Sequence, residues 1–277
     1  MPRKLISVIG VMVLLTMGVT TLGCPPPVAE DPEVLRGTLV IAGSTSVAPI
    51  AEELARAFEA KHPEVRIDVH STGSSAGIKA AGDGTAGIGM SSRYLRDAEK
   101  GLGLREVIIA RDAIVAIVHP ANPVIDLTTE QLRQIYAGEI TNWREVGGRD
   151  APIMVITREE GSGTRGAFED MVMDDVPIFP GAITMVGAGG VKAALVGAEH
   201  GIAYISLWGV DKTVKALKID GVMPTAESVL AGKFEIARPY LFLTLGEPDE
   251  LERAFIDFVM SKAGQDIIEK AGLVPVR

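Results

Sequence analysis

Residues 39–49 read LVIAGSTSVAP, and the change of pattern within them decides the fold. The apolar run at 39–42 predicts a short buried strand. Residues 43–46 then form a polar turn of glycine and hydroxyl side chains, and a helical pattern runs from Val47 to Ala60. The stretch therefore predicts a strand, a hydroxyl-rich turn and a helix N-terminus in direct succession.

Similar successions recur along the chain. The later turns follow strands predicted at 65–70, 87–90 and 153–157, and they read STGSS at 71–75, SSR at 91–93 and REEGSGT at 158–164. Buried strands are also predicted at 107–110 and 114–118, and helices at about 165–173, 251–260 and 264–271. Strands that alternate with helices in this way predict an α/β fold with mainly parallel sheets.

Two breaks divide this fold into two predicted lobes. We predict that the chain crosses between the lobes at the proline-rich residues 119–123 and again around 208–218. The first lobe then comprises 37–115 and 208–277, and the second lobe comprises 116–207. Two lobes joined by two strands leave a cleft between them for a ligand.

The N-terminus has the pattern of an export signal. Arg3 and Lys4 precede an apolar run at 5–22 that contains no charged residue. We therefore predict a signal peptide at 1–23 and an extracytoplasmic location for the folded part.

Cys24 is the only cysteine, so it has no intramolecular disulfide partner. Residues 21–24 read TLGC and are similar to a bacterial lipoprotein cleavage box, which predicts that Cys24 carries a lipid that tethers the protein to the membrane. An uncleaved anchor and a signal cut elsewhere are the alternatives. The proline-rich residues 24–36 predict a stiff, extended linker between the tether and the folded part.

Composition excludes several classes of partner. The net charge of −9 disfavours nucleic acid, and it requires that any anion site work through local dipoles. Aromatic residues make up only 5% of the chain, which favours a small polar ligand over a peptide or polymer. The four histidines are scattered without metal-ligand spacing, so we expect no metal and no cofactor.

The sequence also argues against an enzyme. Ser162 lies between two glycines, but residue 160 is glutamate, so the Gly-x-Ser-x-Gly elbow of hydrolases is absent. Residues 187–192 read GAGGVK and resemble part of a P-loop, yet Ala193 stands where that motif needs serine or threonine. We therefore expect a binding protein, with a hydrolase as the weaker alternative.

The hydroxyl-rich turns carry the predicted chemistry. A helix N-terminus offers unpaired N–H groups and a partial positive charge, which bind an anion without a full cation. Arg158 adds a guanidinium that grips two oxygens of a phosphate at once. Taken singly, each serine is typical of an ordinary N-cap and Arg158 of a surface ion pair. The turns at 43–46, 71–75 and 158–164 together favour a site for a tetrahedral oxyanion.

These turns resemble the signature segments of the phosphate-binding proteins of phosphate ABC importers. The resembling segments read GSTSVAP at 43–49, GSSAG at 73–77, GMSSR at 89–93 and REEGSGTR at 158–165, and the likeness extends from Thr38 to the C-terminus. The resemblance implies a two-lobed type II periplasmic-binding-protein fold whose lobes close on phosphate. It also implies docking onto ABC permease subunits, and we expect a monomer.

Carried over by motif position, the resemblance implies ten ligand contacts. They are Ser44, Thr45, Ser46, Ser74, Ser91, Ser92, Arg158, Ser162, Gly163 and Thr164. Some members of the family have aspartate where Ser92 stands, and a carboxylate there accepts a proton from phosphate but not from sulfate. Sulfate, molybdate and tungstate therefore stay open as alternative ligands.

Overall fold

The computed structural model describes Met1 and residues 34–276. The predicted signal peptide, Cys24 and most of the predicted linker lie outside these residues. Among the described residues, no helix is long and apolar enough to cross a membrane.

Ten strands form one sheet in the order β2-β1-β3-β11-β4-β8-β6-β7, with β9 and β12 also paired to β4. The strands of this sheet are β1 (Gly37–Gly43), β2 (Val65–Ser71), β3 (Ile88–Ser91), β4 (Leu104–Val118), β6 (Met154–Arg158), β7 (Ile183–Met185), β8 (Gly201–Ser206), β9 (Lys215–Ala216), β11 (Ala237–Leu245) and β12 (Val274–Pro275). A separate parallel pair joins β5 (Asp126–Leu127) to β10 (Lys218–Ile219).

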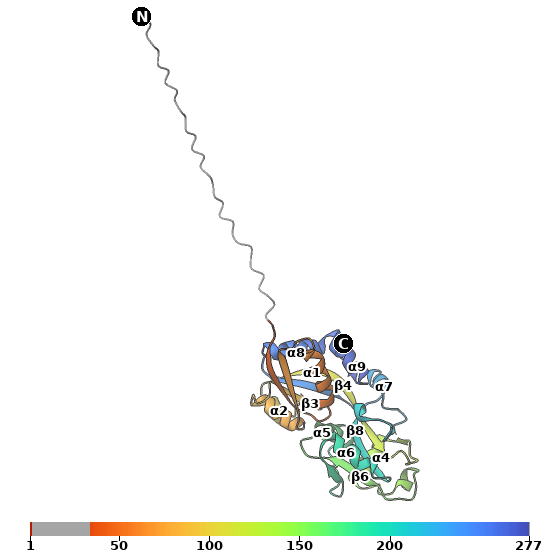
Figure 1. Cartoon of the computed structure of the whole chain (residues 1–277). Coiled ribbons are helices and arrows are strands. Elements are labelled where there is room, and N and C mark those ends of the chain that lie inside the picture. The colour runs from red at the N-terminus through yellow and green to blue at the C-terminus, as the bar shows by residue number, and fades with distance from the viewer. Residues whose placement is uncertain (2–33, 277) are drawn as a thin grey trace. The chain divides into compact units, whose positions relative to one another are not determined.

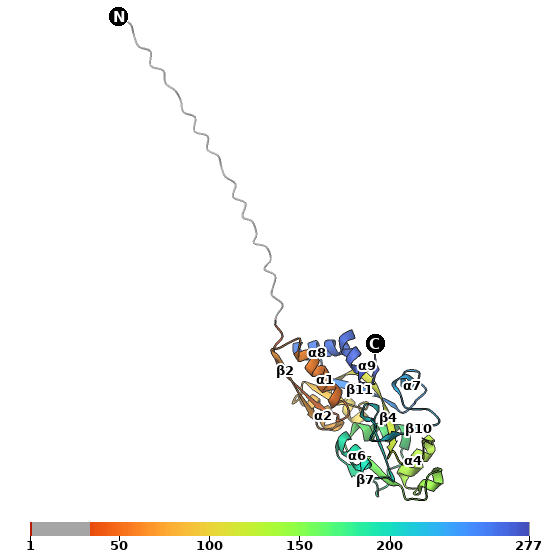
Figure 2. The same ribbon diagram turned by 45° about the vertical axis from the view of Figure 1, so that its right-hand side comes forward.

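The helices lie in two groups, which Figure 1 shows on either side of β4. The α-helices are α1 (Ala48–Glu59), α2 (Ser74–Gly82), α3 (Asp97–Lys100), α4 (Thr129–Ala137), α5 (Gly163–Phe168), α6 (Gly187–Val196), α7 (Ala226–Leu230), α8 (Glu250–Met260) and α9 (Lys262–Lys270). Short 3₁₀ helices span Trp143–Val146 and Leu207–Gly209, and α5 continues into a π-helix at Glu169–Met173. Turning the view by 45° keeps α1, α2 and α8 in one group and α4 and α6 in the other (Figure 2).

The two long strands β4 and β11 connect two parallel sets of strands. In one set β1 pairs in parallel with β2 and β3, and in the other β6 pairs in parallel with β7 and β8. Every antiparallel strand pair in the described part includes β4 or β11. This α/β fold is two-lobed, and β4 runs through both halves because it pairs with β11 up to Ala113 and with β8 from Ile114.

The first half has helices on both faces of its sheet. Tyr240 and Phe242 of β11 pack in a cluster with side chains of α1 and α8, whereas Leu241 and Leu243 pack against Ile78 of α2. Side chains alternate between the two faces of a strand, so one strand supplies both layers of apolar contact. The ends of β1 and β3 are held between these layers.

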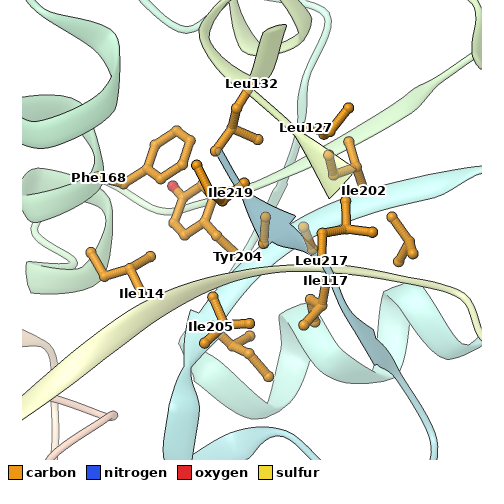
Figure 3. Packing of buried hydrophobic residues seen from close by; sticks show 14 of the residues in the cluster. Ile114, Ile117, Leu127, Leu132, Phe168, Ile202, Tyr204, Ile205, Leu217 and Ile219 are labelled. Carbon is orange, nitrogen blue, oxygen red and sulfur yellow. The ribbon is translucent and has the colours of Figure 1, made fainter. Parts of the chain in front are cut away.

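A second apolar cluster fills the other half (Figure 3). Phe168 stacks on Tyr204 with ring centroids 4.1 Å apart, and Tyr136 lies 4.7 Å from Phe168. The Tyr136 hydroxyl donates to the carbonyl of Ile156 at 3.2 Å, so the buried phenol is paired. This packing holds the end of α5 against β6 and β8.

One prediction about the strands is wrong. The segments 107–110 and 114–118 belong to one strand, β4, because the Asp112 carboxylate is paired inside the sheet and the polar residues at 111–112 do not break it.

Residues 214–236, predicted in the first lobe, contribute Val214, Leu217 and Phe234 to the second cluster. The chain returns there because β9 pairs with β4, and it crosses to the first half only as β11 begins.

The close packing of α2 on the strand ends provides a test. A Cβ atom at Gly77 would lie 2.5 Å from the Ala42 carbonyl oxygen, whereas one at Gly82 of the same helix would lie 3.5 Å from Leu102. We expect Gly77→Ala to lower the free energy of unfolding by about 1–3 kcal/mol through overpacking. Gly82→Ala should be neutral or stabilising by up to about 1 kcal/mol. Equal losses in urea denaturation of the two variants would contradict this packing.

Candidate functional site

Three hydroxyl-rich turns meet at one place between the two halves. Ser46, in the turn after β1, lies with its Oγ 2.8 Å from Oγ1 of Thr164 in α5. The backbone N–H of Ser75 in α2 donates to the carbonyl of Gly161 at 3.1 Å. Turns that are more than 80 residues apart in sequence are therefore in direct contact.

Three serine hydroxyls of the first half form a buried cluster. The Ser44 hydroxyl donates to Oγ of Ser92 at 2.9 Å, and Oγ of Ser74 lies 3.5 Å from Oγ of Ser92. The backbone N–H of Ser92 donates to Oγ of Ser74 at 3.2 Å. All three side chains are at most 2% exposed, so their hydrogen bonds compete little with water.

Gly163 brings α5 against this cluster. A Cβ atom at this position would lie 2.1 Å from Oγ of Ser74 and 2.6 Å from Oγ of Ser92. Only a glycine allows the first turn of α5 to approach the serines so closely. The backbone of the second half therefore faces the serine cluster of the first half directly.

Arg158 ends β6 at the same place and is 2% exposed. Its guanidinium donates to both carboxylate oxygens of Glu159 at 2.8 Å, and Nη2 also donates to Oγ1 of Thr45 at 3.0 Å. The backbone N–H of Gly187 at the start of α6 donates to Glu159 at 3.2 Å. Arg158 thus bridges the two halves while its charge is balanced by a carboxylate.

The pKa of Glu159 reflects these contacts. Partial burial raises the pKa of its carboxyl group, but the hydrogen bonds and charge of Arg158 and the N–H of Gly187 outweigh burial. The net result is a pKa below the ordinary value, which favours the ionised carboxylate at neutral pH.

Two of the predicted residues have hydroxyls that bond to backbone groups two or three residues further along the chain. The hydroxyl of Ser162 accepts the backbone N–H of Arg165 at 3.2 Å, as an N-cap of α5 does. The hydroxyl of Ser91 donates to the carbonyl of Arg93 at 2.8 Å and accepts the N–H of the same residue at 3.3 Å. Both residues are buried beside the site, and their hydroxyls stabilise the local backbone.

Sequence reasoning missed a second buried arginine at the site. Arg238 of β11 donates through Nε and Nη2 to Oδ2 of Asp112 at 3.1 and 2.9 Å, and both side chains are nearly inaccessible. Its Nη1 lies 3.3 Å from Oγ of Ser92. Burial raises the pKa of Asp112, and the charge of Arg238 opposes that effect. The available signal was Arg238 as the one charged residue of β11 and Asp112 between the apolar runs of β4, although sequence alone does not say that the two charges meet.

A cavity of about 190 Å³ opens beside Thr45 and Ser46. The start of α6, including Ala188 and Gly189, lines it, together with Trp208. The residues that resembled part of a P-loop therefore line a space next to the site. Among the described residues, no group of three or more His, Cys, Asp or Glu side chains is placed to hold a metal ion.

Comparison with known proteins identifies the family. Residues 29–263 match the PBP superfamily domain. The phosphate-binding protein PstS of Bacillus subtilis is 31% identical over 90% of this chain and 84% of its own length, and that of Borreliella burgdorferi is 30% identical over 86% and 89%. This chain belongs to the PBP superfamily, in the family of the PstS proteins.

Solved structures of PBP superfamily members agree with this assignment. A protein from Clostridium perfringens, assigned as a phosphate ABC transporter substrate-binding protein and solved with bound phosphate, is 46% identical with a TM-score of 0.85. The match covers 87% of this chain and all of that one. An ABC-type phosphate transport receptor from Vibrio cholerae is 37% identical with a TM-score of 0.73, over 85% of this chain and 99% of its own.

The ion pair of Arg158 and Glu159 should make part of the stability depend on pH. A carboxyl whose folded pKa is depressed contributes stability above its ordinary value of 4.5, and that contribution is lost as the pH falls through the lowered pKa. We expect Glu159→Gln to lower the free energy of unfolding at neutral pH and the difference from wild type to shrink in acid. Denaturant unfolding at a series of pH values measures this.

Glu160→Gln is the matched control, because Glu160 is the next residue and is exposed. Its free energy of unfolding should differ little from wild type at every pH. A deficit of Glu159→Gln that stays constant or grows in acid would contradict the role given to the pair.

Proposed function

We propose that this protein is an extracytoplasmic solute-binding protein that captures inorganic phosphate and delivers it to an ABC permease. The PstS relatives and the phosphate-bound structure of the C. perfringens protein support this proposal. The proposed contacts are the ten residues named from sequence.

One observation carries the proposal: buried hydroxyl and N–H donors from both halves converge with Arg158. Ser46 and Thr164 meet at 2.8 Å, and Thr45 lies 3.0 Å from the guanidinium. A tetrahedral anion offers acceptors in several directions, so donors from opposite sides suit it. In a site with little water, each such hydrogen bond is electrostatically stronger than it would be in solution.

Binding requires that the two halves separate and close. The chain passes between them in β4 and at the start of β11, and we propose that these two strands act as the hinge. Contacts such as Ser46 to Thr164 belong to the closed arrangement. Closure around the anion would then exclude water and present a surface formed by both halves to the permease.

We propose binding without catalysis. In the described part of the chain, none of the four histidines hydrogen-bonds to a hydroxyl of the serine cluster. Those hydroxyls bond to one another, to backbone groups and, at Ser92, to Arg238. A serine nucleophile needs an adjacent general base. The relatives are likewise substrate-binding proteins.

A second candidate ligand is another tetrahedral oxyanion, such as sulfate, molybdate or tungstate. The observation that favours it is Ser92, which stands where some family members carry a proton-accepting carboxylate. Calorimetric titration with phosphate, sulfate and molybdate, after unfolding and refolding to remove bound ligand, separates the two. Tight phosphate binding supports the proposal, and a preference for sulfate or molybdate moves the function to another importer.

Replacing Arg158 tests the site directly. We expect Arg158→Ala to weaken phosphate binding by about 2–5 kcal/mol, the usual loss when one partner of a buried charged hydrogen bond is removed. Arg149→Ala is the control, because Arg149 forms an exposed ion pair with Glu199 at 2.8 Å. Calorimetry should give wild-type affinity for the control. Unchanged phosphate affinity in Arg158→Ala would overturn the site assignment.

We propose further that a lipid on Cys24 tethers the mature, monomeric protein to the outer side of the membrane. The export pattern at 1–23 and the small residue before Cys24 support this tether. Mass spectrometry of membrane-extracted full-length protein should find a diacylglyceryl group on Cys24. The Cys24→Ser variant cannot carry the lipid, so it should either be absent from the membrane fraction or retain an uncleaved signal peptide. An unmodified Cys24 in the membrane-extracted protein would refute the tether.

A further inference from the structure

The hydrogen bonds around Ser92 determine which role its hydroxyl can play toward a ligand. Ser92 follows β3, and its side chain is fully buried. Its Oγ lies 2.9 Å from Oγ of Ser44, 3.3 Å from Nη1 of Arg238 and 3.5 Å from Oγ of Ser74. A serine hydroxyl has one proton to donate and two lone pairs that accept, so these neighbours can be assigned one by one.

Two of the neighbours donate to Ser92. A guanidinium has no acceptor, so Arg238 is the donor in its contact with Ser92. Oγ of Ser44 accepts the backbone N–H groups of Ser46 and Val47 at 3.3 and 3.4 Å, which engages its lone pairs and directs its proton to Ser92. Both lone pairs of Ser92 are therefore engaged, and its proton is left for Oγ of Ser74 at 3.5 Å or for a ligand.

Arg238 is held in the orientation that this assignment needs. Its Nε and Nη2 donate to Oδ2 of Asp112, while Oδ1 of Asp112 accepts from the Ser206 hydroxyl at 2.8 Å and from the N–H of Leu207 at 3.1 Å. The remaining Nη1 faces the carbonyl and the hydroxyl of Ser92 at 3.4 and 3.3 Å. A planar fork fixed on one side by a carboxylate keeps its other side directed at Ser92.

We propose that Arg238 is a positioning residue that fixes Ser92 as a hydrogen-bond donor to the bound anion. Ser92 then donates to an unprotonated oxygen of a tetrahedral oxyanion, and position 92 does not accept a proton from the ligand. This inference rests on the proposed function. It also means that position 92 gives no preference for phosphate over sulfate, so any such preference arises elsewhere in the site.

The first test measures the phosphate affinity of Ser92→Ala and of wild type at one pH below and one pH above the second pKa of phosphate. Loss of a donor to a charged ligand should weaken binding at least about tenfold, by the same factor at each pH. A hydroxyl that accepted the ligand's proton would give a loss that grows in acid, where phosphate carries more protons. That result would overturn the inference.

The second test asks whether Arg238 acts through Ser92. Arg238→Lys keeps a cation beside Asp112 but lacks the rigid second branch that reaches Ser92. We expect weaker phosphate binding in this variant and a smaller effect of Ser92→Ala in its background than in wild type. If the fold-losses in phosphate affinity of the two single variants simply multiply in the double variant, the positioning role is contradicted. The pH comparison above uses only Ser92→Ala, so it decides the donor role even where Arg238→Lys does not fold.

Ser261→Ala is the control, because its hydroxyl caps α9 away from these residues. It should bind phosphate as wild type does. Wild-type protein that binds no phosphate would overturn the proposed function and this inference together. Wild-type binding combined with an acid-enhanced loss in Ser92→Ala would overturn this inference alone.

Discussion

The buried pair of Asp112 and Arg238 lies where the chain passes between the two halves of the molecule. The two residues are directly opposite in the antiparallel register of β4 and β11. Removing one partner of such a pair typically costs about 3–5 kcal/mol, because the other charge is left buried and uncompensated. The pair thus fixes the register of the two connecting strands, and through Nη1 of Arg238 it reaches the serine cluster of the site.

The charge balance of the site follows from this arrangement. Three buried arginines lie beside the hydroxyl-rich turns, and each has its own carboxylate: Arg93 with Glu99, Arg158 with Glu159 and Arg238 with Asp112. The surroundings thus carry little excess positive charge, in keeping with a chain whose net charge is −9. Directed hydroxyl and N–H donors, held in place by these ion pairs, are what the site offers to an anion. Such an arrangement selects for geometry and for unprotonated oxygens more than for charge alone.

Much of the fold and of the candidate site was predictable because the relevant signals are local. The alternation of short apolar runs with helical patterns identified β1, α1, β2, β6, α8 and α9 to within a few residues. Glycine and hydroxyl residues after those strands marked the turns that meet in the structure. The merging of two predicted strands into β4 was not predictable, since it depends on Arg238, whose partner Asp112 is 126 residues away in sequence.

The sequence by itself determined the alternation of strands and helices and the hydroxyl-rich turns, because each depends on neighbouring residues along the chain, and it made Arg158 a candidate contact. Only the tertiary structure decided that residues 214–236 pack with the second half and that Arg238 joins the site. It also decided the hydrogen-bonding polarity of Ser92, which arises from Ser44 and Arg238 at distant points of the chain. Contacts of this kind depend on strand register and helix packing, and these are properties of the whole folded chain.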